Sequence, residues 1–379
     1  KSGSTIETAS QMAAANQQLI KQGLDPKNHF VVITDPGSPL DIQARENNLR
    51  VVNADPNVGG RFSALSAYGL TPAALIGIDI SILLDDAYEA SQSFAKPGSV
   101  VTQVAAALAD KFFSSAGFLD TGSNVTGLSE WIEQLIAEST GKDGKGVLPI
   151  TLTRKSKLNY PVITFDGSGE NSVEASLGEH FIFWQWVTAL LGYLLQVDPF
   201  NQPNVTEAKD KTNALLSRWS KGREEINPVF ESGSIAVYST LKEDSVSHYL
   251  ERAIANSKGY LAIMAYLHRG IDDQIKDLAP LLESKSKLPT TFGWGPRFLH
   301  STGQFHKGGP STGSFIQVTA DNENNWPIPG KDFGFETLIM AQALGDLEAL
   351  SSRGFSVIRF HLKTRKQGIA ELLSAAEKI

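Results

Sequence analysis

LAIMAYL, at residues 261–267, is an unbroken apolar run with the length of a single strand that is buried on both faces. Three comparable runs follow it: TTFGWG at 290–295, FIQVTA at 315–320 and SVIRFHL at 356–362. Helical patterns lie between them. Alternation of buried strands with helices is typical of a parallel sheet that helices cover on both faces. The last third of the chain therefore predicts a complete α/β layer.

The first two thirds continue this alternation. Further strands are expected at 29–34, 49–54, 147–153, 161–165 and 234–239, and further helices at 6–22, 40–48, 62–90, 100–113, 178–196 and 205–218. Another helix is expected within VTGLSEWIEQLIAEST at 125–140, with Ser129 as its cap. We place a domain boundary near residue 126, which gives a first unit over 1–126 and a second over 127–379 with a C-terminal α/β portion.

Composition limits the classes of function. The 379 residues are 41% hydrophobic and 20% charged, which is ordinary for a globular protein of two or three domains. Net charge −7 argues against a general nucleic-acid or anionic-membrane binder, so any phosphate site must be local. The absence of cysteine excludes disulfides and thiolate metal sites and fits a cytoplasmic protein. The apolar run at 181–197 contains glutamines and a threonine, which favours a buried helix over a membrane span.

Two segments rich in glycine and hydroxyl groups precede predicted helices. KSGSTIET places Ser2, Ser4 and Thr5 where a helix start could hold a phosphate, although an ordinary serine cap explains the pattern as well. VGGRFSALSAYG puts Gly60 and Arg61 where the backbone can approach a ligand and a guanidinium can meet an oxyanion. A plain loop with a surface arginine remains the other interpretation.

A third segment, ESTGKDGKG at 138–146, begins with Glu138 at the end of an apolar helical run. Partial burial there would fit this carboxylate for proton abstraction, and the glycines would bend the chain around a ligand. Taken singly, a glutamate at a helix end before a glycine is more often structural.

Five motifs together resemble the phosphoglucose isomerase family: SGSTIET, VGGRFSALSAYGL, ESTGKDGKGVLP, DPFNQPNVTEAK and LHSTGQFHKGG. They span residues 2–309. The segments GPRFLHSTGQFHKGGPSTG and FGFETLIMAQALGD look most like the isomerase half of bifunctional transaldolase/glucose-6-phosphate isomerases. The resemblance implies sugar-isomerase (SIS) units, each a three-layer αβα sandwich with a doubly wound parallel sheet. It also implies interconversion of glucose 6-phosphate and fructose 6-phosphate through a cis-enediol, with no metal or other cofactor.

The resemblance also implies a role for each matching residue. Glu138 would move the proton between C1 and C2, Arg61 would stabilise the enediol charge, Lys209 and His300 would open the sugar ring, and Ser2, Ser4, Thr5 and Gly60 would bind the substrate. The histidine motif comes last here, whereas in familiar members it precedes the lysine motif, so His180 stays open as an alternative to His300. His306 and Lys307 are considered as additional loop contacts to substrate.

The chain begins at Lys1, inside the first motif, so we expect that it is a piece preceded by further sequence, such as a transaldolase domain. A homodimer is the expected assembly, and a small sugar phosphate the expected partner. The alternative function, from another class, is a non-catalytic SIS-type module that binds a sugar phosphate and regulates.

Overall fold

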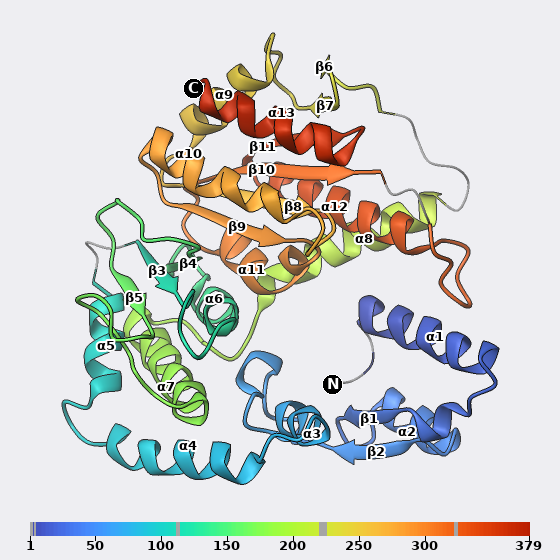
Figure 1. Ribbon diagram of the computed structural model, residues 1–379, viewed down its shortest axis with the longest axis vertical. Coiled ribbons are helices and arrows are strands. Elements are labelled where there is room, and N and C mark those ends of the chain that lie inside the picture. Colours follow the sequence, from blue (N-terminus) through green and yellow to red (C-terminus); the bar gives the residue numbers. More distant parts are fainter. Residues whose placement is uncertain (1–2, 4, 111–113, 220–225, 322–324) are drawn as a thin grey trace. The chain divides into compact units, whose positions relative to one another are not determined.

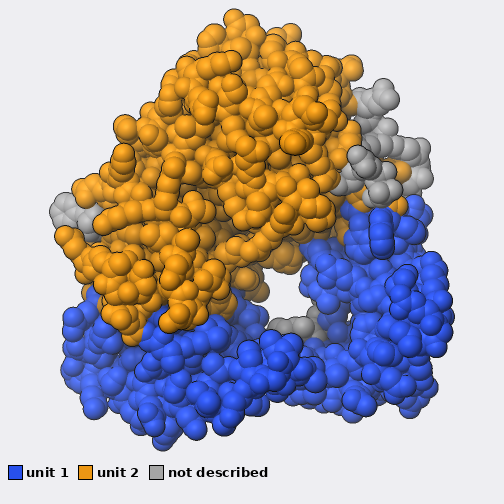
Figure 2. All heavy atoms as spheres, viewed as in Figure 1, with its two compact units in different colours: residues 1–103, 175–187, 326–335 blue, residues 104–174, 188–325, 336–379 orange. Residues whose placement is uncertain are grey.

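The computed structural model describes residues 3, 5–110, 114–219, 226–321 and 325–379. It divides the chain into two units, coloured separately in Figure 2. Unit 1 comprises 1–103, 175–187 and 326–335, and unit 2 comprises 104–174, 188–325 and 336–379. The predicted division near residue 126 refers to sugar-isomerase units and stays a prediction.

Unit 2 contains a six-stranded sheet with the strand order β6-β7-β11-β10-β8-β9 (Figure 1). Its strands are β6 (Phe230–Ser232), β7 (Ile235–Tyr238), β8 (Tyr260–Tyr266), β9 (Thr290–Trp294), β10 (Gly313–Ala320) and β11 (Ser356–Leu362). The four strands β9, β8, β10 and β11 run parallel, with Ile263 of β8 opposite Ile316 of β10 and Phe292 of β9. The four apolar runs of the last third are therefore neighbours in one sheet, and the predicted α/β class is confirmed.

Helices cover both faces of this sheet, because side chains of β8 alternate between two apolar clusters. Leu261, Ile263 and Ala265 pack with α9 (Val246–Asn256), α10 (Leu278–Ser286) and α13 (Arg365–Glu377). Tyr260, Ala262, Met264 and Tyr266 pack on the opposite side with α11 (Ser301–Gly308) and α12 (Phe335–Ser352). All seven residues of β8 are buried, which explains its unbroken apolar run. The three-layer αβα arrangement is thus present in unit 2.

One edge of this sheet differs from the sequence prediction. The run SIAVYS forms β7, but β7 lies antiparallel to β11 and to the short strand β6. Gly233 joins β6 to β7 with φ +41°, a left-handed backbone conformation that glycine adopts readily. A hairpin rather than a helical crossover therefore links these two strands, and the sheet is mixed at this edge.

A second sheet of unit 2 has the order β4-β3-β5, with all three strands parallel. These are β3 (Ser115–Leu119), β4 (Leu148–Thr151) and β5 (Val162–Thr164), of which only β3 was not expected from the sequence. The helix α6 (Leu128–Thr140) contacts β3 and β4. The other helices of this part of the chain are α5 (Val100–Leu108), α7 (Leu177–Leu195) and α8 (Thr206–Trp219). Ser129 does not cap α6: Gly127 is the cap residue, and the Asp120 carboxylate accepts hydrogen bonds from the N–H groups of Gly127 and Ser129, both at 2.8 Å.

Unit 1 begins with α1 (Ile6–Lys21), β1 (Val31–Thr34), α2 (Pro39–Glu46) and β2 (Arg50–Asn53), where β1 and β2 pair in parallel. The single helix predicted over 62–90 is wrong. It is divided into α3 (Ala67–Leu75) and α4 (Ile80–Phe94), because Gly77 has φ +88° and Asp79 caps a new helix through its side chain. Among the described helices, none combines the length and apolar character needed to span a bilayer.

Candidate active site

Glu138 lies in the last turn of α6 and is only 8% exposed. The Nε2 group of Gln134, one turn earlier, donates a hydrogen bond to Glu138 Oε2 at 3.2 Å. The apolar residues Leu135, Ile136 and Ala137 beside it are fully buried and hold this end of the helix in the interior. The partial burial that the sequence predicted for this carboxylate is therefore present.

The ESTGKDGKG loop that follows α6 is fixed to α11 through backbone contacts. At Gly141 an added Cβ would lie 2.3 Å from the Cα of Phe305, so no side chain fits there. The N–H group of Gly144 donates to the carbonyl of Gly308 at 2.9 Å. The glycine at 141 therefore allows a close approach of α11 to the end of the helix that carries Glu138.

Gln304, in α11 and fully buried, joins three of the motifs. Its Nε2 group donates to the carbonyl of Gly141 at 2.8 Å and to Oδ1 of Asn204 at 2.7 Å. Its Oε1 accepts the N–H of Asn204 at 2.8 Å. Because Gly141 belongs to the glutamate motif, Asn204 to the lysine motif and Gln304 to the histidine motif, one side chain links all three.

His300 and Lys209 occupy elements that adjoin this junction. His300 is the residue before α11, is partly buried, and donates its N–H to the carbonyl of Arg297 at 2.8 Å. Lys209 lies near the start of α8 and is exposed. The helix α8 contacts the short helix Arg297–Leu299 that leads to His300, and α11 contacts α6. Within unit 2 the structure therefore brings together the three segments that carry Glu138, Lys209 and His300.

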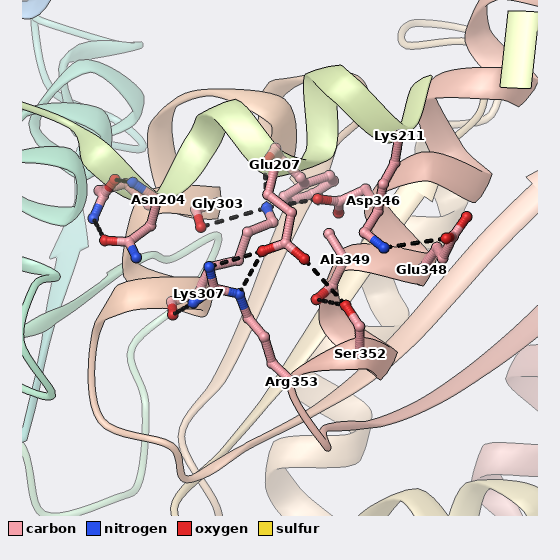
Figure 3. Close-up of polar contacts among 12 residues, drawn as sticks. Asn204, Glu207, Lys211, Gly303, Lys307, Asp346, Glu348, Ala349, Ser352 and Arg353 are labelled. Carbon is pink, nitrogen blue, oxygen red and sulfur yellow. Dashed lines mark hydrogen bonds and ion pairs between the residues drawn. The ribbon is translucent and has the colours of Figure 1, made fainter. Parts of the chain in front are cut away.

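A network of charged groups fixes α8 against α11 and α12 (Figure 3). Nζ of Lys307 lies 2.6 Å from Oδ1 of Asp346, and neither side chain is exposed. Arg353 donates to the carbonyl of Lys307 at 2.7 Å and forms an ion pair of 2.8 Å with Glu207 of α8. Burial raises the pKa of Asp346, while the ammonium of Lys307 opposes that shift. The helix that presents Lys209 is thereby tied to the interior.

His306 and Lys307, considered from the sequence as substrate contacts, are instead interior residues of α11. Nδ1 of His306 lies 3.0 Å from the hydroxyl of Tyr260, and the two rings stack. Burial lowers the pKa of His306 to about 3, so the imidazole is neutral at physiological pH. Both of these polar side chains therefore belong to the core of unit 2.

The remaining predicted residues belong to unit 1. Arg61 lies in the short helix Gly60–Phe62, is 5% exposed, and places its guanidinium 5.5 Å from the ring centre of Phe62. A Cβ added at Gly60 would meet no atom within 4 Å. Thr5 is the cap residue of α1, but its side chain makes no capping hydrogen bond. Ser2 and Ser4 lie outside the described residues.

The alternative histidine, His180, belongs to the part of α7 in unit 1 and is fully buried. Burial lowers its pKa to about 4, although the carboxylate of Glu179 acts in the opposite direction. Such a histidine is neutral at physiological pH. A neutral, fully enclosed imidazole is less suited than the partly exposed His300 to meeting a sugar.

Curated proteins of one activity match this chain. The probable glucose-6-phosphate isomerase of Haloarcula marismortui is 34% identical over 154 residues, which make up 39% of this chain and 35% of that protein. The glucose-6-phosphate isomerase of Mycoplasmopsis pulmonis is 28% identical over 292 residues, 58% of this chain and 68% of that protein. The chain is a relative of the phosphoglucose isomerase family. The match spans about one third of the first relative and about two thirds of the second.

Other comparisons add little to this relationship. No protein-family model matches the chain. Among solved structures, a hypothetical protein from Thermus thermophilus is 19% identical, with a TM-score of 0.37 over 100% of this chain and 62% of that chain. A likeness of that size carries no argument. The likeness to the transaldolase-fused isomerases stays a prediction.

The sequence did not reveal two features of this isomerase relative that organise its candidate site. Gln304 was quoted within a motif, but its partners lie 163 and 100 residues away along the chain, so no local pattern shows them. The pairing of Lys307 with Asp346 was missed too. The aspartate within the apolar helical segment FETLIMAQALGDLEAL was the available signal, because buried charges are usually paired.

Proposed function

We propose that this protein is an aldose–ketose isomerase that interconverts glucose 6-phosphate and fructose 6-phosphate. The observation that carries the proposal is the junction at Gln304, which joins the segments of the glutamate, lysine and histidine motifs within one unit. The names of the curated relatives support the same reaction. An aldose and its ketose differ only in proton positions on two adjacent carbons and their oxygens, so the reaction requires little more than acids, bases and charge stabilisation.

Glu138 is the proposed base. In the forward direction its carboxylate takes the proton from C2 of the open-chain aldose, which leaves a cis-enediolate with its charge on O1. A proton then passes from the C2 hydroxyl to O1, and the acid form of Glu138 returns the first proton to C1. Burial of all but 8% of Glu138 limits its hydration and favours proton transfer to and from carbon. Gln134 orients the carboxylate by donating to one oxygen.

Lys209 and His300 are the proposed ring-opening pair. Opening a pyranose requires a proton on the ring oxygen and loss of a proton from the C1 hydroxyl. The partly buried imidazole of His300 can pass a proton to the ring oxygen, and the exposed ammonium of Lys209 can donate a hydrogen bond to a sugar oxygen. Arg61 is assigned to the negative charge of the enediol, and Ser2, Ser4, Thr5 and Gly60 to substrate binding. The hydroxyl of Thr5 makes no capping hydrogen bond to α1, which supports the last assignment.

The decisive experiment replaces Glu138 by Gln, which removes the base and keeps the size and the hydrogen-bonding capacity of the side chain. Fructose 6-phosphate conversion is coupled to an NADP-linked glucose-6-phosphate dehydrogenase. We expect turnover to fall at least about a hundredfold, because a positioned general base typically contributes that much. Asp143→Asn is the matched control: this carboxylate is exposed, lies in the same loop, and has φ +54°, which asparagine tolerates.

Two results would contradict the assignment. If Glu138→Gln retains more than a few per cent of the parent's turnover, Glu138 is not the base. If the parent binds sugar phosphate and shows no turnover above that of buffer, the alternative of a non-catalytic SIS-type regulatory module is correct. A cytoplasmic location, a homodimer and an attached transaldolase domain accompany the proposal as further predictions.

A further inference from the structure

Unit 2 contains a pocket of about 830 Å³ that Glu138, Lys209 and His300 do not line. Its walls come from the start of α6, the segment 151–158 after β4, the helix α10, and β9 with the residues that follow it. All of these lie within unit 2. A volume of this size accommodates a small organic molecule.

The pocket is basic in a protein whose net charge is −7. Seven lysine or arginine side chains line it, against four acidic ones. The acidic groups are all engaged by the protein. Asp120 accepts two N–H groups of the α6 turn, Glu130 pairs with Arg269 at 2.7 Å, Glu133 pairs with Arg297 at 3.0 Å, and Glu283 accepts the hydroxyls of Ser156 and Tyr160 at 2.6 and 2.9 Å.

The side chains of three of the cations make neither an ion pair nor a hydrogen bond among the described residues, whereas Lys287, which also has no ion pair, donates to the carbonyl of Ser284 at 2.6 Å. Arg154, Lys155 and Lys157 are exposed, line the pocket, and make no ion pair with any carboxylate in the part of the chain that is described. They flank Ser156, whose bond to Glu283 anchors their loop to α10. The anchor places them at the pocket in a fixed loop, where their positive field is concentrated by low-dielectric walls.

Two further observations point to a ligand rather than to an ordinary surface. The residues Ser129 and Thr151 belong to the pocket lining, and their hydroxyls are buried beneath its surface without a hydrogen-bond partner among the described residues. Such groups are rare unless something else satisfies them. Phe292 and Trp294, whose ring centres are 5.2 Å apart, supply an apolar wall beside the cations.

We propose that this pocket is a binding site for a small molecule that carries two or more phosphate groups, separate from the proposed catalytic site. The three available cations of the 154–157 loop hold the phosphates, because charge-assisted hydrogen bonds from lysine and arginine to phosphate are strong. The wall formed by Phe292 and Trp294 accommodates the organic part of the molecule.

The test uses inorganic pyrophosphate as the probe and amide hydrogen exchange, read by mass spectrometry, on the full chain. At a probe concentration ten times the dissociation constant, exchange in peptides covering 126–134 and 151–158 should slow by up to about tenfold, since bound ligand suppresses local opening in proportion to its occupancy. Replacing Arg154, Lys155 and Lys157 together by Gln should abolish the slowing. Because all three side chains are exposed, the triple variant should fold as the parent does, and its circular dichroism verifies this.

The matched control replaces Lys242, Lys258 and Lys378 by Gln, three exposed lysines of unit 2 that do not line the pocket. This variant carries the same change in net charge and should keep the slowing. The proposal is overturned if pyrophosphate slows exchange only in 3–9 or 138–146, where the proposed catalytic motifs lie, or if the loop variant retains the effect. Neither result depends on turnover, so the proposal stands or falls independently of the isomerase assignment.

Discussion

Lys307 and Asp346 form an ion pair in the interior of unit 2 and connect α11 to α12 there. Neither side chain is exposed, and the Lys307 ammonium also donates to the carbonyl of Phe298 at 2.9 Å. Removing two charges from water is costly, so such a pair contributes more to the uniqueness of the packing than to net stability. Because Lys307 belongs to the histidine motif and Asp346 to α12, the pair fixes the helix that begins beside His300.

Removing one member of this pair should strongly destabilise the protein. We expect Asp346→Asn and Lys307→Met each to lower the free energy of unfolding by about 3 to 5 kcal/mol, since each leaves a buried group uncompensated. Urea titration followed by circular dichroism measures the change. The pair of Lys211 and Glu348, 3.1 Å apart and partly exposed, is the control, and Lys211→Met should cost no more than about 1 kcal/mol. Equal losses at the two pairs would contradict the expectation.

For single residues, the sequence predicted the burial of a side chain better than it predicted which residues the side chain contacts. The end of an apolar helix was enough to predict burial of Glu138, because the same residues that form the helix enclose its last turn. Gln304 carries no such signal, since its partners come from loops that only the folded chain brings near. The prediction that Ser129 caps α6 was wrong, because the carboxylate of Asp120, eight residues before the helix starts, accepts the hydrogen bond from the N–H group of Ser129.

Among the elements, α11 and the end of α6 approach so closely that backbone meets backbone. A Cβ at Gly308 would lie 2.6 Å from the carbonyl oxygen of Gly141, and one at Gly141 would lie 2.3 Å from the Cα of Phe305. No side chain fits between the two backbones at Gly141, and beside this contact the Gln304 side chain bridges the carbonyl of Gly141 and Asn204. Sequence periodicity predicted α6, but it did not predict α11, because the segment around His300 was expected to be a loop. Periodicity also contains no information on how near two helices come.

Loss of the Gln304 bridge should loosen these loops without unfolding the unit. In Gln304→Ala we expect faster amide exchange in peptides covering 141–146 and 202–206, because the carbonyl of Gly141 and the N–H of Asn204 lose their partner. Gln317→Ala is the matched control: Gln317 is also buried and donates to the carbonyl of Ala343 at 2.8 Å, within the sheet core. Unchanged exchange in both loops of Gln304→Ala would show that the bridge does not position them.

For the whole molecule, buried histidines make stability depend on pH. His306 has a folded-state pKa of about 3, below its ordinary value of 6.5, so the unfolded chain binds more protons between these values. Stability from this group is fully present above pH 6.5 and is lost as the pH falls towards 3. Between pH 7 and pH 4 the loss amounts to about 3 kcal/mol.

His306→Gln tests this pH dependence. The variant should be less stable than the parent at pH 7, because a smaller side chain replaces the stacked ring, but its free energy of unfolding should fall by about 3 kcal/mol less between pH 7 and pH 4. Urea titrations at both pH values give the difference, and other titrating groups cancel in the comparison. An identical decrease in parent and variant would exclude His306 as the source.

The two described sheets of unit 2 share one further property: their longest strands are internal. The strands β8, β10 and β11, of seven or eight residues, lie inside the six-stranded sheet, whereas the edges of all three sheets are strands of three to five residues. An exposed edge is where a second polypeptide adds by backbone pairing, and a short edge offers such a chain few bonds. The short edge strands thus limit the backbone pairing through which copies of this chain would aggregate into fibrils, and they do so through strand length alone.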